Sequence, residues 1–138
     1  MVVADQLTKA WALRALDDGP IRLVGRVRLA LTYNTAAAFG LGGAFVPFLA
    51  VTALVVVVLL VTRSEATRRP LLAAAGGLVV GGAFGNLADR LFRSPGLLRG
   101  AVVDFVDLRW WPVFNLADTA ITVGCVILVW AGWRTKEP

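Results

Sequence analysis

The sequence predicts an all-α membrane protein, and two observations support this prediction. Hydrophobic residues make up 58% of the 138 residues, whereas only 17% are charged. Two long segments, 29–62 and 70–88, contain no charged residue at all. A membrane-spanning helix needs about 20 predominantly apolar residues, and soluble domains of this size rarely contain such runs. The chain is too short for a second domain, so we expect one integral membrane domain over residues 1–138.

The N-terminal segment predicts a helix that is incomplete. Residues 10–16 are helix-like but too short to cross a membrane, and polar residues precede them from Asp5 to Lys9. A spanning helix ending near Asp5 would need about a dozen further apolar residues upstream. We therefore expect a first transmembrane helix whose upstream part is truncated.

The next segment predicts a small β element. Residues 21–29 alternate apolar and basic side chains over part of their length, which is typical of a short strand or two. Because this segment lies between membrane helices, we expect the β element to lie on the outer membrane surface.

Three apolar stretches are long enough to cross a membrane, at about 44–62, 71–88 and 113–133. The loop 63–70 carries three arginines, and positive residues favour the cytoplasmic side. We therefore place this loop inside the cell. Cys125, the single cysteine, falls within the third stretch, where we expect it to be buried and to serve in packing.

Small residues recur in the second stretch. Every fourth residue forms one stripe that ends in a carboxylate: Ala73, Gly77, Gly81, Gly85 and Asp89. Small residues at this spacing let membrane helices approach closely, so we expect this stripe to pack against neighbouring helices.

Two aspartates are unusual for their surroundings. Asp104 lies in an apolar run in the loop between the second and third stretches, and Asp118 begins the third. A carboxylate in hydrocarbon is energetically costly, so its presence there indicates a functional site. Asn115 could serve as a helix cap, but we see no such structural reason for Asp118. Two carboxylates that meet at one interface predict a pair that shares a proton, as in aspartic proteases.

The composition excludes several other kinds of chemistry. The chain has no histidine, which removes Ser-His and Cys-His nucleophilic sites and any zinc site built from histidine. Its net charge of +5 is scattered over short polar segments, so we expect no nucleic-acid partner. The remaining acid–base groups are carboxylates, lysine and tyrosine, and we expect no metal and no cofactor.

The expected topology brings polar groups to one membrane face. They lie at the ends of the predicted spans or in the segments that join them: Asp5, Asn34, Asn86, Arg90, Asp104, Asn115 and Asp118. Arg90 has two possible roles, because it could neutralise Asp89 locally or contact a substrate.

These residues carry a family resemblance. The chain resembles the lipoprotein signal peptidases (signal peptidase II), which are bacterial aspartic proteases of the membrane. Five blocks appear in the family's order over nearly the whole chain: 5–9, 34–40, 85–90, 102–105 and 114–118. One departure is Ala36, which stands where the family usually has glycine.

The resemblance implies a bundle of four transmembrane helices with a small β cradle on the outer surface. It implies a multi-pass protein of the bacterial cytoplasmic (inner) membrane with its active site near the outer face, in contact with membrane lipid. The substrate would be a diacylglyceryl-modified prolipoprotein, cut before its lipidated cysteine. Asp104 and Asp118 would be catalytic, and further residues would bind substrate or support the pair: Asp5, Lys9, Asn34, Asn86, Asp89, Arg90 and Asn115.

Two other functions are compatible with a small polar membrane protein. A transporter or channel component could use buried Asp and Asn side chains as an ion path. It would spread polar residues through the membrane depth, whereas these residues gather at one face. A non-catalytic assembly subunit would need no convergent acids. We therefore favour the protease.

Overall fold

The computed structural model describes residues 1–35, 69–95 and 99–134. The predicted span at 44–62, the arginine loop up to residue 68 and Ala36 lie outside these ranges. The described elements are α1 (Val2–Ala15), β1 (Ile21–Arg22), β2 (Arg28–Asn34), α3 (Pro70–Phe92), β3 (Val102–Asp107) and α4 (Leu116–Arg134).

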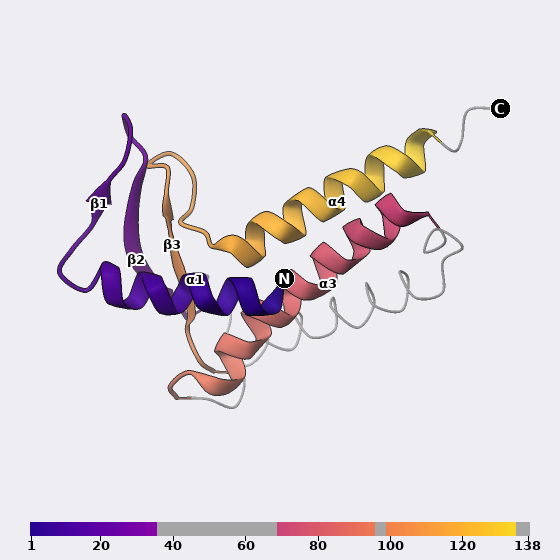
Figure 1. Ribbon diagram of the computed structural model, residues 1–138. Helices are drawn as coiled ribbons and strands as arrows, with labels where there is room; N and C mark the ends of the chain where they lie inside the picture. The colour runs from indigo at the N-terminus through magenta and orange to yellow at the C-terminus, as the bar shows by residue number, and fades with distance from the viewer. Residues whose placement is uncertain (36–68, 96–98, 135–138) are drawn as a thin grey trace.

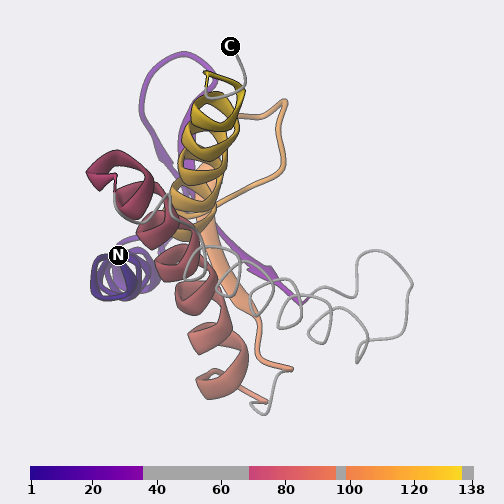
Figure 2. The ribbon, with the colours of Figure 1, turned by 90° about the vertical axis from the view of Figure 1, so that its right-hand side faces the viewer.

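The sheet lies at one end of the helices. Figure 1 shows α3 and α4 running side by side away from the three strands, while α1 crosses α3 and continues to the sheet. Figure 2, turned by 90°, shows α1 end-on beside α3. The C-terminal end of α3 and the N-terminal start of α4 therefore both lie on the strand side of the molecule.

The small β element is a three-stranded antiparallel sheet in the order β1-β2-β3. The predicted strands at 21–29 correspond to β1 and the start of β2, but we expected Asp104 in a loop and that expectation is wrong. Asp104 lies in β3, opposite Thr32 of β2. Phe105 of the same strand packs against Ala12 of α1 and against Leu16, which directly follows α1, and these contacts fix the sheet on the helix.

Helix α3 is the one described helix that is long and apolar enough to cross a membrane. Its 23 residues correspond to about 34 Å at the helical rise, against a hydrocarbon core of about 30 Å. A second apolar helical stretch, Leu116–Ala131 of α4, is shorter. The first helix, α1, has 14 residues, and its upstream extension stays a prediction.

The predicted stripe of small residues is correct in part. A Cβ on Gly81 would lie 2.6 Å from Met1, and one on Gly85 would lie 2.5 Å from Asp5 Oδ2, so these glycines let α1 approach. A Cβ on Gly77 would meet nothing within 4 Å. A second row packs against α4, where a Cβ on Gly82 would lie 2.5 Å from the carbonyl oxygen of Ala117. Helix α3 therefore has two close-approach faces rather than one.

Apolar side chains of α4 point outward. Val126 and Val129 are more than half exposed, and Trp133 is 77% exposed. Cys125 is exposed as well, so the expectation that it is buried is wrong. An apolar run predicts burial in protein only when water is the surrounding solvent, and a helix in lipid can expose such a face.

Candidate active site

A buried ionic cluster joins α1 to α3. Lys9 Nζ lies 2.8 Å from Asp5 Oδ2 and 2.9 Å from Asp89 Oδ2, and all three side chains are fully buried. Arg93 Nε lies 2.7 Å from the other oxygen of Asp89. Two cations therefore balance two anions, as burial of charge requires. Asp89 is held by Lys9 and Arg93, so the suggested local pairing with Arg90 is not what neutralises it.

The same cluster also holds the start of α4. Asp5 Oδ1 accepts a hydrogen bond from the backbone N–H of Ala117 at 3.0 Å. This N–H belongs to the first turn of α4, where backbone donors have no partner within the helix. A carboxylate at this end is also favoured by the helix dipole. Asp5 therefore links α1, α3 and α4 at one point.

Asn115 and Asp118 form a reciprocal cap at the start of α4. Asn115 Oδ1 accepts from the backbone N–H of Asp118 at 3.0 Å, and Asp118 Oδ2 accepts from the backbone N–H of Asn115 at 3.1 Å. This is a capping-box arrangement. The expected capping role of Asn115 is present, but the view that Asp118 lacks a structural role is wrong. Its second oxygen, Oδ1, faces Asn86 instead.

Asn86 connects the ionic cluster to Asp118. Lys9 Nζ donates to Asn86 Oδ1 at 2.9 Å, and Asn86 Nδ2 donates to Asp118 Oδ1 at 2.8 Å. An ammonium group has donors only, so the amide oxygen of Asn86 must face Lys9. The amide nitrogen is then left to face Asp118. Lys9 thus fixes the orientation of the Asn86 side chain, and Asn86 in turn contacts Asp118. The effect of Lys9 on Asp118 is therefore indirect.

Asp104 lies on the other side of Asn115. Asn115 Nδ2 donates to Asp104 Oδ1 at 2.7 Å, and Asn34 of β2 makes a second side-chain hydrogen bond to this carboxyl. Asp104 is 2% exposed. Burial, followed by the negative charge of Asp118, raises the pKa of Asp104 from 3.8 to about 6. Both acids thus accept a hydrogen bond from Asn115, Asp104 from its side chain and Asp118 from its backbone N–H, and the two carboxyls interact electrostatically.

Arg90 lies at the end of α3 beside this pair. Its guanidinium group is half-buried and interacts electrostatically with Asp104 and Asp89. Its backbone carbonyl accepts from the N–H of Gly100 at 3.0 Å. A Cβ on Gly100 would clash with the carbonyl oxygen of Asp89, so only glycine lets the chain entering β3 pass this close to α3.

An apolar cavity of about 370 Å³ opens beside Asp118. Its walls come from α4 and from the segment after β3: Leu108, Trp110, Trp111, Phe114, Thr119, Thr122 and Val123. The hydroxyls of Thr119 and Thr122 donate to the carbonyls of Asn115 and Asp118, which leaves the wall largely apolar. Asp118 is half-buried, so one carboxylate of the pair faces a space that an apolar ligand could occupy.

Among the described residues, no three Asp, Glu or Cys side chains converge as metal ligands. The predicted site residues other than Arg90 instead fall into two adjoining groups, the first of which also contains Arg93. The first is the ionic cluster of Asp5, Lys9, Asp89 and Arg93; the second, which we call the acid pair and its amides, comprises Asn34, Asn86, Asp104, Asn115 and Asp118.

Two residues in or beside the ionic cluster, Arg93 and Gln6, were not predicted from the sequence. Arg93 follows Asp89 by four residues on α3, a spacing that places the two side chains on one helix face and could have indicated the pair. Gln6 Nε2 donates to the carbonyl oxygen of Gly85 at 3.0 Å and to Asp89 Oδ1 at 3.2 Å. Nothing in the sequence around Gln6 indicates that contact.

The comparisons with known proteins agree on one family. A family model described as signal peptidase (SPase) II matches residues 1–134. The lipoprotein signal peptidase of Rhodococcus jostii is 44% identical over 131 residues, covering 94% of this chain and 66% of that protein. The lipoprotein signal peptidase of Mycolicibacterium smegmatis is 42% identical over 127 residues, covering 91% of this chain and 54% of that protein.

Solved structures give the same result for the fold. Two structures, each described as a bacterial membrane enzyme, are 27% identical in sequence to this chain, with TM-scores of 0.78 and 0.77. They cover 94% and 99% of this chain, and this chain covers 85% and 86% of theirs. The chain is therefore shorter than its relatives, and it spans 66% and 54% of the two curated relatives above. By its match over residues 1–134, the chain belongs to the signal peptidase II family.

Proposed function

We propose that this protein is an aspartic endopeptidase that removes the signal peptide from diacylglyceryl-modified prolipoproteins by cutting before the lipidated cysteine. One observation carries the proposal most directly: both carboxyls accept a hydrogen bond from Asn115, Asp104 from its side-chain Nδ2 and Asp118 from its backbone N–H. The relatives named lipoprotein signal peptidase support the substrate class.

Asp104 is the better candidate for the acid. Its pKa of about 6 leaves a large share of the carboxyl protonated at mildly acidic pH. Asp118 accepts N–H donors from Asn86 and Asn115 and is half-buried beside the cavity, which suits a carboxylate that acts as a base towards water.

The reaction then follows the general scheme of paired carboxyls. Asp118 removes a proton from water as the water oxygen attacks the scissile carbonyl carbon. Asp104 gives its proton to the carbonyl oxygen, so that a tetrahedral diol forms. Asp118 then passes its proton to the leaving nitrogen, the carbon–nitrogen bond breaks, and a diol hydroxyl returns a proton to Asp104. Each carboxyl ends in its starting state.

The surrounding residues supply binding and orientation in this proposal. Asn34 binds the carboxyl of Asp104 and Asn86 that of Asp118, while Asn115 binds Asp104 through its side chain and Asp118 through its backbone N–H. Arg90 offers a half-buried cation near Asp104 that would bind a substrate carbonyl. The apolar cavity beside Asp118 would take an apolar part of the substrate near the cleavage site. Asp5, Lys9 and Asp89 would act indirectly, by fixing Asn86 and the start of α4.

We further propose a four-helix, multi-pass protein of the bacterial inner membrane with the acid pair at the outer face. Helix α3, the apolar part of α4 and the predicted span at 44–62 would supply three crossings, and α1 with an upstream extension the fourth. The polar end of the bundle, next to the sheet, would lie at the outer boundary. Between Asp118 and Arg134, α4 has no charged residue, which disfavours an ion path through the membrane.

The test is a cleavage assay with purified protein and a lipidated prolipoprotein over a range of pH. Cleavage that requires the lipid, follows a bell-shaped pH profile and disappears in Asp118→Asn is the expected result. A matched prolipoprotein without the diacylglyceryl group should remain intact. Reconstituted protein that conducts protons or ions but never cleaves the lipidated substrate would overturn the proposal in favour of transport.

A further inference from the structure

Four arginines line one surface pocket on the sheet, and none of its lining residues belongs to the acid pair and its amides. The pocket has a volume of about 560 Å³ and is lined by Arg22, Gly25, Arg26, Val27, Arg28 and Arg109. The arginines come from β1, from the turn between β1 and β2, from β2 and from the segment after β3. Residues far apart in sequence thus contribute the same charged group to one hollow.

One carboxylate neutralises part of this charge. Asp107 Oδ2 lies 2.6 Å from Arg28 Nε, and Asp107 Oδ1 accepts from the backbone N–H of Arg109 at 2.7 Å. Both oxygens of Asp107 are therefore engaged. Among the described residues no other carboxylate forms an ion pair with the arginines of the pocket, which leaves four guanidinium groups facing one carboxylate.

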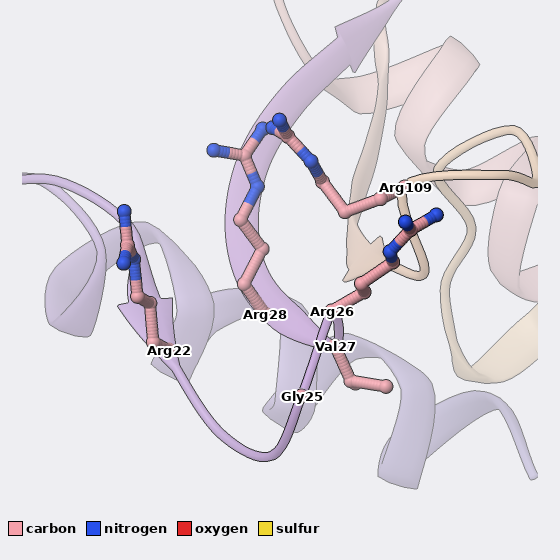
Figure 3. Close-up of a pocket in the computed structure, with 6 residues that line it drawn as sticks. All are labelled: Arg22, Gly25, Arg26, Val27, Arg28 and Arg109. Carbon is pink, nitrogen blue, oxygen red and sulfur yellow. The ribbon is translucent and has the colours of Figure 1, made fainter.

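The guanidinium groups line one pocket although all of them are positively charged. In Figure 3 the ends of Arg28 and Arg109 point toward one another, with Arg26 nearby and Arg22 on the other side of the hairpin. Arg109 has a φ of 70°, which is uncommon for a residue with a side chain. Clustered guanidinium groups repel one another in the absence of an anion, and they match the oxygens of a phosphate in geometry and charge.

The turn beside the pocket combines exposed apolar residues with flanking arginines, as segments that contact a membrane do. Leu23 and Val24, at the tip between Arg22 and Gly25, are 53% and 81% exposed. The backbone hydrogen bonds Leu23 N–H to Val27 O and Val27 N–H to Val24 O hold this tip in place. Exposed apolar residues flanked by arginines are typical of segments that lie in a membrane interface.

Two exposed tryptophans adjoin the arginine pocket. Trp110 and Trp111 directly follow Arg109, and both are more than half exposed. Tryptophans are enriched where membrane meets water, at the depth of the lipid headgroups. The arginine pocket thus adjoins apolar residues on the hairpin tip and aromatic residues after β3.

We propose that this arginine pocket binds the phosphate of an anionic phospholipid headgroup while Leu23 and Val24 insert among the acyl chains. The bound lipid would fix the sheet, and with it Asn34 of β2 and Asp104 of β3, at the membrane surface. This site lies outside the proposed acid pair, so its existence does not depend on the proposed peptidase activity.

The test measures lipid preference on the full chain in nanodiscs. The probes are phosphatidylglycerol and phosphatidylcholine, and the readout is the lipid retained by the protein in native mass spectrometry. We expect the wild-type protein to retain phosphatidylglycerol preferentially. In the double variant Arg22→Gln/Arg26→Gln, the preference for phosphatidylglycerol over phosphatidylcholine should fall about fivefold for each arginine removed. The matched control, Arg14→Gln/Arg99→Gln, removes two exposed arginines outside the pocket and should keep it.

Two further arms identify the source of the phosphate. Inorganic phosphate at millimolar concentration should fail to displace the retained lipid, and Leu23→Ser/Val24→Ser should weaken retention while the arginines remain. Displacement by inorganic phosphate, or by an acidic peptide, would overturn the assignment to a lipid. Equal retention of the two lipids, or an unchanged preference in Arg22→Gln/Arg26→Gln, would overturn the site itself.

Discussion

Two polar clusters adjoin one another at the strand end of the helices. In one, cations bind the carboxylates, and in the other, neutral amides bind them. In the ionic cluster, Lys9 and Arg93 neutralise Asp5 and Asp89 at distances of 2.7 to 2.9 Å. In the acid pair and its amides, Asp104 and Asp118 are held by neutral amides instead. Within the described ranges, no cation forms an ion pair with Asp104 or Asp118.

From this difference we expect the ionic cluster to serve stability and the acid pair to serve the proposed chemistry. A buried ion pair whose partners are all present holds elements in place, and removal of one partner leaves an uncompensated charge. Two acids held by amides instead repel each other, so one of them readily keeps a proton. Asn86 joins the two clusters, since it accepts from Lys9 and donates to Asp118. We therefore expect substitutions on either side of Asn86 to have different effects.

The largest expected effect is on cleavage. Asp118→Asn should lower cleavage of a lipidated prolipoprotein by about 10⁴-fold or more, as removal of a catalytic group does in other proteases. The amide keeps an oxygen that accepts from the Asn115 N–H, so the cap on α4 is retained and the protein should fold. The matched control is Asp17→Asn, an exposed aspartate after α1, which should cleave at the wild-type rate. Wild-type cleavage by Asp118→Asn would remove this residue from the chemistry.

The next effect is on stability. Lys9→Met leaves Asp5 and Asp89 facing one another in a buried site, and removal of one partner from such an ion cluster costs about 3–5 kcal/mol. Thermal unfolding in detergent should show a large fall in midpoint. Arg14→Met removes an exposed charge from the same helix and should change stability by less than about 0.5 kcal/mol. If Lys9→Met unfolds like the wild type, the ionic cluster does not hold α1 against α3.

A smaller effect tests the close approach of α1 to α3. Gly85→Ala places a methyl group 2.5 Å from Asp5 Oδ2, and overpacking of this kind costs about 1–3 kcal/mol. Gly77→Ala, on the same helix, meets nothing within 4 Å and should be neutral or slightly stabilising because alanine favours helix. Equal unfolding midpoints for the two variants would contradict the account of Gly85 as a contact for Asp5.

The sequence predicted much of this arrangement because membrane constraints are strong. Charged residues are so costly in hydrocarbon that Asp89, Asp104 and Asp118 could be singled out from their apolar surroundings. The strand start at 21–22 was visible from its alternation. Strand β3 was not, because it is a short apolar run whose partner, β2, lies about 70 residues earlier in the chain.

Other features depend on contacts that one sequence does not reveal. The reciprocal cap follows an Asn-x-x-Asp spacing that could have been recognised at 115–118. The pairing of Asp89 with Lys9 required knowing that α1 crosses α3 at Gly85. The outward face of Cys125 follows from the choice of neighbours around α4, which composition does not determine.

The pH dependence of stability tests the central contrast most directly, with Asp104→Asn beside the wild type. Burial raises the pKa of Asp104 to about 6, so the folded protein holds this proton more tightly than the unfolded chain. The resulting contribution to stability is present below about pH 4 and is lost as the pH rises to about 6, since the unfolded state releases its proton first. Above pH 6 the wild type therefore contains a buried carboxylate that Asp104→Asn lacks.

The decisive measurement is thermal unfolding of Asp104→Asn and the wild type at pH 4 and pH 8, with cleavage assayed in parallel. We expect the variant to be inactive at both pH values, about 1–3 kcal/mol more stable than the wild type at pH 8, and of similar stability at pH 4. A variant that is less stable at pH 8, as Lys9→Met should be, would place Asp104 among the structural ion pairs. A variant that still cleaves would contradict the assignment of the acid pair as the chemical centre.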